Sequence, residues 1–171
     1  TGHEDDADRP AALLRALLPG VAVHLHEPAW PLEVFGMHAE VPGGWRVSAA
    51  AFRPGHATVT CAPWSRRAKA RPRSFLRLDR LAPARVVLGG ESLERWAAAF
   101  FAETSAKPDA PTAAGEDAVA WERSRRLPFT RRRHRLAARR EADALLACAT
   151  WGRKPLDAVA FQRLWGSHAT V

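Results

Sequence analysis

The pattern of hydrophobic and polar positions changes near residue 20 from helical spacing to alternation. Leucines recur at helical spacing over residues 13–18, and Pro19 and Gly20 end that segment, which predicts a short helix. Apolar and polar residues then alternate in short runs bounded by Pro and Gly, a pattern typical of half-buried strands. The runs cover residues 21–26, 32–35, 37–41, 45–52, 57–61, 75–81 and 84–88. Together they predict a small antiparallel β-barrel or curled sheet over about residues 21–90.

The second half of the chain shows no such alternation. Ser92 is placed to cap a helix in which Leu93, Trp96 and Phe100 form an apolar stripe. Three further segments are predicted as helices: residues 116–126, 130–152 and 155–166. The sequence thus predicts an α+β protein with a short N-terminal helix, the β-rich region and a mostly helical C-terminal extension.

A segment rich in small residues and Pro separates these two halves. We expect a core domain over residues 1–103 that ends with the Ser92 helix, a linker over residues 104–115, and a basic helical extension over residues 116–171.

Positive charge is concentrated in two short windows. Residues 64–85 contain eight Arg and Lys residues against the single acidic residue Asp79, and residues 121–140 contain nine against Glu122. The net charge of the whole chain is +8, so the remainder of the chain is acidic. Charge at this density repels itself and is most stable beside a polyanion. Because Arg pairs with phosphate through two parallel hydrogen bonds, the windows indicate nucleic acid.

The first window predicts an extended basic segment. Pro63 and Pro72 favour extended backbone, in which alternate residues point the same way, about 7 Å apart. The residues expected to contact phosphates are Arg66, Arg67, Lys69, Arg71, Arg73 and Arg77. Trp64 and Phe75 flank this row and are candidates for stacking on an unpaired base. The alternative is a solvated loop whose aromatic residues belong to the core.

The second window predicts a helix with arginines over about half of its circumference. The residues expected to contact nucleic acid are Arg123, Arg125, Arg126, Arg131, Arg132, Arg133, Arg135, Arg139 and Arg140. A solvated helix would normally mix Glu with Arg at i, i+4 spacing, whereas within the predicted helix acidic residues begin only at Glu141. The alternatives are another acidic partner or a merely solvated face.

The sequence contains no motif of an enzyme active site. It has no P-loop, GxGxxG, HExxH or GxSxG pattern. His24, His26, His38 and His56 lack Cys or carboxylate partners at a recognised metal-ligand spacing. We therefore predict no catalytic residue, no metal site, no cofactor and no small-molecule substrate.

The two cysteines and the acidic N-terminal residues bear on the compartment. Cys61 and Cys148 are far apart in the sequence, which favours two reduced, partly buried thiols over a disulfide. The sequence contains no run of about 18 apolar residues, so it predicts no membrane-spanning helix. The N-terminal residues are acidic, whereas a mitochondrial targeting segment is poor in acidic residues. We therefore expect a protein of the mitochondrial matrix from which an N-terminal targeting segment has been removed.

Two functions from different classes fit these observations. The first is a non-catalytic RNA-binding structural protein, as in an organellar (mitochondrial) ribosome, that contacts rRNA phosphates through both windows and neighbouring proteins of a large assembly through its other faces. The alternative is an accessory structural subunit of a large mitochondrial complex such as a respiratory enzyme, in which the arginines meet acidic protein surfaces or lipid headgroups.

Overall fold

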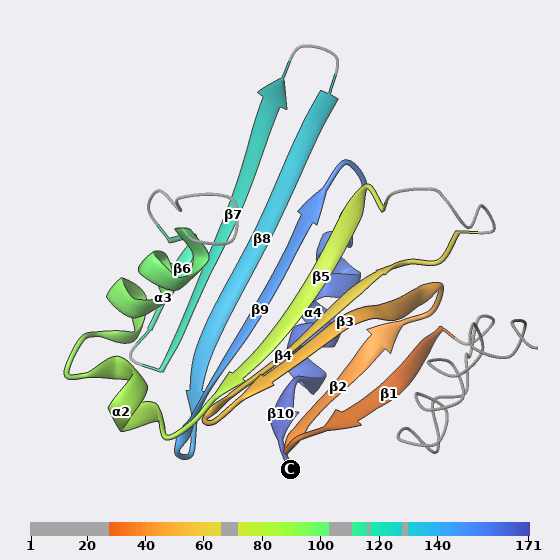
Figure 1. The fold of residues 1–171 in the computed structure, drawn as a ribbon. Coiled ribbons are helices and arrows are strands. Elements are labelled where there is room, and N and C mark those ends of the chain that lie inside the picture. Colours follow the sequence, from red (N-terminus) through yellow and green to blue (C-terminus); the bar gives the residue numbers. More distant parts are fainter. Residues whose placement is uncertain (1–27, 66–71, 103–110, 116, 128–129) are drawn as a thin grey trace, which may run out of the picture.

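Two β-sheets and three helices make up the described part of the chain (Figure 1). The computed structural model describes residues 28–65, 72–102, 111–115, 117–127 and 130–171, and at residues 114, 123–127 and 130–132 it describes the backbone alone. The strands are β1 (Ala29–Val34), β2 (Met37–Pro42), β3 (Trp45–Arg53), β4 (His56–Pro63), β5 (Ser74–Leu81), β6 (Ala113–Ala114), β7 (Ala118–Leu127), β8 (Thr130–Glu141), β9 (Ala144–Gly152) and β10 (Ala169–Thr170). The helices are α2 (Ala84–Leu88), α3 (Leu93–Ala102) and α4 (Ala158–Ser167).

The larger sheet is antiparallel throughout and has the strand order β3-β4-β5-β9-β8-β7-β6. It consists of two meanders, β3–β5 and β6–β9, that meet where β5 pairs with β9. Strands from both sides of residues 104–115 therefore share one sheet. The smaller sheet has the order β1-β2-β10.

Tight turns with positive φ angles connect the hairpins. Phe35 and Gly36 have φ angles of 50° and 70° and join β1 to β2, in the left-handed conformation that two-residue hairpin turns favour. At Gly55, between β3 and β4, a Cβ atom would lie 2.6 Å from the carbonyl oxygen of Ala82. Glycine is required there because the chain after β5 passes so close.

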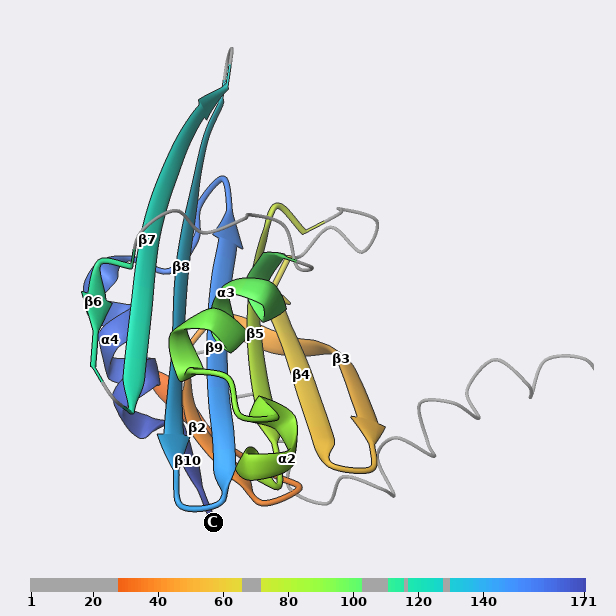
Figure 2. The same ribbon diagram turned by 90° about the vertical axis from the view of Figure 1, so that its left-hand side faces the viewer.

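The larger sheet is covered on both faces by different elements (Figure 2). Leu76, Leu78 and Cys148 face one cluster, which contains Phe161 and Leu164 of α4 and the buried residues of β1 and β2. Residues of opposite parity on the same strands, such as Leu81 and Ala147, face a second cluster with α3. The face that packs against α3 is called the α3 face below. Because β9 lies between β5 and β8 and is covered on both faces, residues 144–150 are all buried.

The expected fold class is wrong in two respects. The β-region does not close into a barrel, because β3 and β6 are the edges of an open sheet that continues into the second half of the chain. The C-terminal region is not mostly helical: residues 118–127, 130–141 and 144–152 are strands, and only the last predicted helix is present, as α4. Residues 84–88, expected as a strand, form α2.

The physical reason lies in tertiary pairing. Arg, Ala and Leu dominate residues 130–149 and have high intrinsic helix propensity, but packing in the centre of a sheet overrides propensity. A fully buried strand has a continuous apolar run, and periodicity cannot separate such a run from a buried helix. The predicted N-terminal helix and the strand over residues 21–26 lie outside the described residues.

Candidate nucleic-acid interface

Only part of the first basic window lies on the described surface. Arg66, Arg67, Lys69 and Arg71 lie outside the described residues. Arg73 is exposed immediately before β5, whereas Arg77 is half-buried within β5. Trp64 is 38% exposed, and Phe75 is half-buried.

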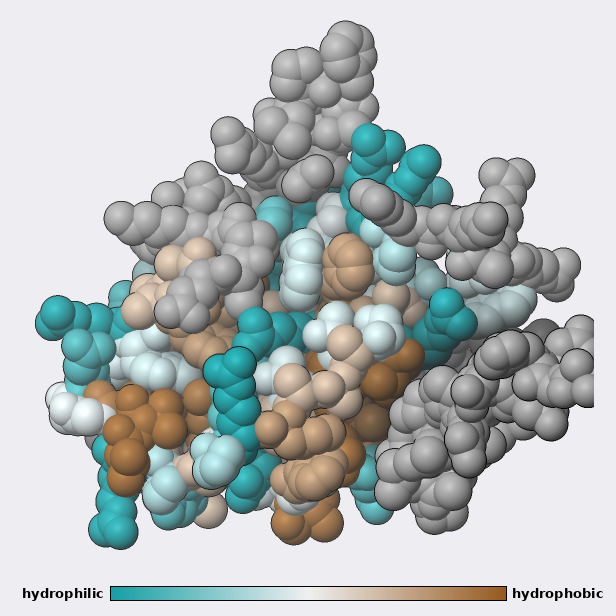
Figure 3. All heavy atoms as spheres, viewed as in Figure 1, coloured by the Kyte–Doolittle hydropathy of each residue, from teal (hydrophilic) through white to brown (hydrophobic). Residues whose placement is uncertain are grey.

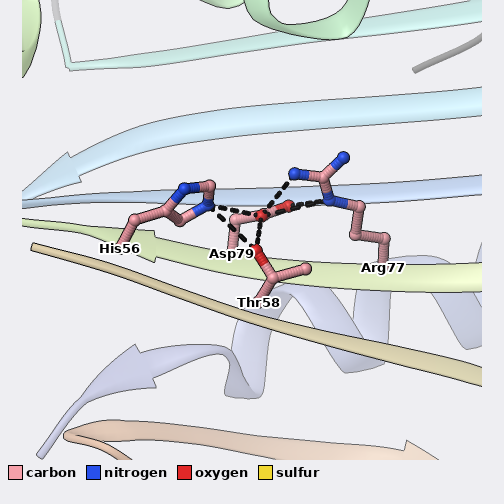
Figure 4. A network of polar contacts seen from close by, with 4 residues as sticks. All are labelled: His56, Thr58, Arg77 and Asp79. Atoms are coloured by element: carbon pink, nitrogen blue, oxygen red, sulfur yellow. Dashed lines mark hydrogen bonds and ion pairs between the residues drawn. The ribbon is translucent and has the colours of Figure 1, made fainter. Parts of the chain in front are cut away.

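Arg77 is part of a buried ion-pair network on the α3 face (Figure 4). The Asp79 side chain is 1% exposed, and its Oδ2 lies 2.8 Å from Nε of Arg77. The hydroxyl of Thr58 donates a 2.6 Å hydrogen bond to Oδ1 of Asp79, and Nε2 of His56 lies 2.9 Å from the same oxygen. The guanidinium of Arg77 also lies 5.2 Å from the ring centre of Phe100 on α3. The charge of Arg77 therefore neutralises a buried carboxylate.

The second window forms strands β7 and β8 and not the predicted helix, and two of its arginines have internal partners. Arg135 is buried, its Nη2 donates a 2.9 Å hydrogen bond to Glu122, and its Nη1 donates to the carbonyl of Leu156. Arg139 lies 2.9 Å from Glu141 and 4.9 Å from the ring centre of Trp165. Both side chains therefore connect the sheet with the segment that contains α4.

Glu141 and His168 have altered acidities beside Arg139. Burial by itself would raise the pKa of Glu141, but hydrogen bonds from Thr170 and the charge of Arg139 outweigh it and hold this pKa below its ordinary value. Burial and then the charge of Arg139 lower the pKa of His168 to about 4, so the imidazole is neutral at neutral pH. Among the described residues, neither ring nitrogen of His168 has a hydrogen-bond partner.

Two further arginines of the second window, Arg133 and Arg140, lie at opposite ends of the sheet. Arg140 is exposed, but it pairs with Leu145 near the β8–β9 turn. Arg133 is exposed and pairs with Gly152, the last residue of β9, which in turn pairs with Ser74. Arg133 thus lies in the same row of the sheet as the start of β5, far along β8 from Arg140.

At that row the two basic windows meet. The backbone N–H of Arg153 donates a 2.9 Å hydrogen bond to the carbonyl of Arg73. Arg73, Arg133, Arg153 and Lys154 are all exposed. Adjacent strands are about 4.8 Å apart, so these residues start from neighbouring backbone positions. We call these four residues the basic end of the sheet.

The β7–β8 hairpin extends from the basic end (Figure 1). Because Arg133 pairs with the final residue of β9, residues 130–132 and their partners 125–127 continue past it as a two-stranded ribbon. The backbone register places Arg125 opposite Arg132 and Arg126 opposite Arg131, and Arg123 opposite His134. Like charges directly opposite each other destabilise a strand pair. Figure 3 shows hydrophilic surface near this end and the broadest hydrophobic areas in the lower half of the same view.

A hollow of about 330 Å³ opens beside the basic end. Its lining consists of Pro72, Arg73, Phe75, Trp151, Gly152 and Arg153. Phe75 and Trp151 are paired across β5 and β9, and their rings are stacked with centroids 5.5 Å apart.

Trp151, Gly152 and Arg153 are not among the residues that the sequence predicted to contact nucleic acid. A signal existed, since an apolar run that ends in Trp-Gly-Arg-Lys places an aromatic ring and two cations at the end of a buried segment. The signal was not interpretable without the strand assignment, because only the pairing with β5 places Trp151 beside Phe75.

The described residues contain no group of three or more His, Cys, Asp or Glu side chains able to hold a metal ion. Cys61 and Cys148 are free cysteines, as expected, and both are buried. Burial raises the pKa of Cys61 to about 12. No helix in the described part of the chain is both long and apolar enough to cross a membrane.

Comparisons with known proteins inform the fold alone. No protein-family model matches the chain, and no curated protein matches it. A crystal structure from Bacteroides thetaiotaomicron VPI-5482, at 1.50 Å resolution, is similar with a TM-score of 0.52 and 9% sequence identity. The match covers 85% of this chain and 49% of that one, so this chain spans about half of that protein's length. At this identity the similarity concerns the arrangement of strands and helices and not an activity.

Proposed function

We propose that the protein binds RNA without catalysing a reaction, and that the basic end of the sheet with the β7–β8 ribbon is the contact surface. The observation that carries this proposal is the convergence of the two basic windows at one row of the sheet, where Arg73, Arg133 and Arg153 are exposed. Cations from three separate segments at one end of a sheet match a phosphate backbone, which presents a repeated negative charge.

The proposal uses fewer arginines than the sequence predicted. Arg77, Arg135 and Arg139 have carboxylate partners within the protein, and Arg140 lies at the other end of the sheet. Phosphate contacts are assigned to Arg73 and Arg133, and to Arg153 and Lys154, which the prediction had omitted. They are also assigned to the arginines of the β7–β8 ribbon, whose backbones extend from the same row: Arg125, Arg126, Arg131 and Arg132.

Membership of an organellar ribosome and location in the mitochondrial matrix stay predictions based on composition. The same holds for the alternative of an accessory subunit in a respiratory complex. Treating the native assembly with RNase distinguishes these two, because only an RNA-bound protein would be released.

The direct test changes three exposed arginines at the basic end. We expect the triple substitution Arg73→Gln, Arg133→Gln and Arg153→Gln to weaken binding to a structured RNA. It should also reduce the slope of log Kd against log salt by roughly 2 to 3, because each lost phosphate contact lowers the number of counterions released on binding. Filter-binding titrations at several salt concentrations measure both quantities.

A matched control removes the same charge elsewhere. Arg53, Arg85 and Arg140 are exposed and lie away from the basic end. The triple Gln variant at these positions should retain the wild-type slope. Equal losses in both variants would mean that net charge, and not this surface, determines binding, and the proposed site would be wrong.

A further inference from the structure

We propose that the hollow beside the basic end holds one unpaired base, so that the bound RNA is single-stranded at this point. This inference rests on the proposed function and adds to it the class of nucleic acid. It depends on two aromatic rings, two arginines and a glycine that the fold brings together from the start of β5 and the end of β9.

The lining combines the two chemistries that a nucleotide requires. Phe75 and Trp151 supply flat apolar surface, on which any base can stack. Arg73 and Arg153 are exposed at the same hollow, and none of the described residues that line it carries a carboxylate. A planar, uncharged ring attached to a negative phosphate complements this arrangement.

The α3 face ends where the hollow begins. Phe75 and Arg77 point to the same face of β5, since they are two residues apart. Phe100 of α3 covers Arg77, whereas the hollow opens beside Phe75. The aromatic pair therefore lies at the boundary between the covered core and the surface, accessible to a ligand.

Hydrogen bonds hold the hollow in shape before any ligand binds. Besides the bond from Arg153 to the carbonyl of Arg73, the N–H of Lys154 donates a 3.0 Å hydrogen bond to Oγ of Ser74. At Gly152, whose φ is +134°, a Cβ atom would lie 2.3 Å from the carbonyl oxygen of Arg73. Glycine thus allows the end of β9 to pass directly against β5. A site that is already ordered loses less entropy when it binds.

The size of the hollow and the chemistry of RNA favour a single unpaired base. A volume of about 330 Å³ is at the lower end of the range for ligand pockets, roughly 300–1,000 Å³, so it suits one ring system. In a duplex the faces of the bases are covered by their neighbours, and proteins stack aromatic side chains on bases of loops, bulges and ends.

The test compares the aromatic side chains with a matched aromatic residue elsewhere. The variants are Trp151→Leu and Phe75→Leu, with Trp151→Phe to retain a ring. The control is Phe52→Leu, because Phe52 is 42% exposed and lies on β3 near the opposite end of the sheet. Three probes of equal length, about 12 nucleotides, are titrated at one salt concentration: single-stranded RNA, duplex RNA and an abasic single strand.

We expect Trp151→Leu to weaken binding of single-stranded RNA by roughly 5- to 150-fold, the loss of one base–aromatic stack. Phe75→Leu should act in the same direction, whereas Trp151→Phe and Phe52→Leu should stay close to the wild type. None of the variants should change binding of the abasic strand or the duplex, because these probes make phosphate contacts without a free base.

The results separate this inference from the proposed function. If both Leu variants bind single-stranded RNA as tightly as the wild type, the base pocket is wrong while RNA binding stands. If they lose affinity for the abasic strand to the same degree, the rings act only by shaping the surface, and the base pocket is again wrong. If the wild type binds none of the three probes, the proposed function itself fails.

Discussion

At the scale of single residues, the environment and not the side-chain type decides what each arginine does. Arg135 is buried and has a carboxylate and a carbonyl as partners, whereas Arg133, two positions earlier on the same strand, is exposed. A buried guanidinium without such partners would be strongly destabilising, so Arg135 depends on Glu122 and on the Leu156 carbonyl. Arginines that neutralise internal carboxylates are not free to bind phosphate.

His168 shows the same dependence on environment through its titration. The pKa of this buried histidine is lowered to about 4, while in the unfolded chain it is near 6.5. The unfolded state therefore binds a proton at a higher pH than the folded state does. This histidine contributes no pH dependence well above pH 6.5 and destabilises the fold progressively as the pH falls from 6.5 towards 4.

We predict that His168→Phe reduces the acid sensitivity of the protein. Between pH 6.5 and 4.5 the wild type should lose about 2 kcal/mol of unfolding free energy that the variant retains, because the variant has no imidazole to protonate on unfolding. Urea unfolding at pH 7.5, 6.5, 5.5 and 4.5 measures this difference. The comparison at pH 7.5 isolates the effect of packing, and parallel stability curves over the whole range would contradict the prediction.

At the scale of elements, β4 and β5 are joined by the Asp79 network as well as by backbone pairing. His56 and Thr58 come from β4, and Arg77 and Asp79 from β5. Because the carboxylate is almost completely buried, it requires all of these partners. The first basic window thus contains the counter-charge of Arg77, the carboxylate of Asp79, and this carboxylate links β5 to β4.

We predict that Asp79→Asn lowers the unfolding free energy by about 3 to 5 kcal/mol, since it leaves the guanidinium of Arg77 without its buried counter-charge. Chemical denaturation at pH 7 measures the loss. Glu91→Gln is the matched control, because Glu91 forms an exposed i, i+4 ion pair with Arg95 at 3.5 Å. That pair should contribute about 0.5 kcal/mol or less. Similar losses for the two variants would show that burial of Asp79 carries no special weight.

At the scale of the whole molecule, the larger sheet joins the two halves of the chain. β9 lies between β5 and β8, and α4 packs on a cluster that contains residues of β2, β4, β5 and β9. Neither half can bury its apolar residues without the other. This arrangement also brings the two basic windows, separated in sequence, to one end of the sheet.

We predict that a fragment of residues 111–171 does not fold alone, because β9 then lacks its partner β5 and the covering residues of β1 and β2. Its amide NMR spectrum should show little dispersion. When a fragment of residues 28–102 is added, the amide spectra of both fragments should become well dispersed. A well-dispersed spectrum of the isolated C-terminal fragment would show that it forms an independent unit.

The sequence by itself determined the local features of this protein. Alternating residues and Pro or Gly turns predicted strands that correspond to β1–β5, and the Ser92 cap and the apolar stripes predicted α3 and α4. The windows of positive charge were also evident, because composition and short-range periodicity are properties of adjacent residues.

Only the tertiary structure decided how these parts combine. Residues 144–150 become a strand because they lie between β5 and β8, and the same pairing places Trp151 beside Phe75 and Arg153 beside Arg73. It also determines that Arg77, Arg135 and Arg139 pair with carboxylates of the protein itself while Arg133 is exposed. Strand pairing and burial join residues far apart in the chain, and a local pattern holds no information about such partners.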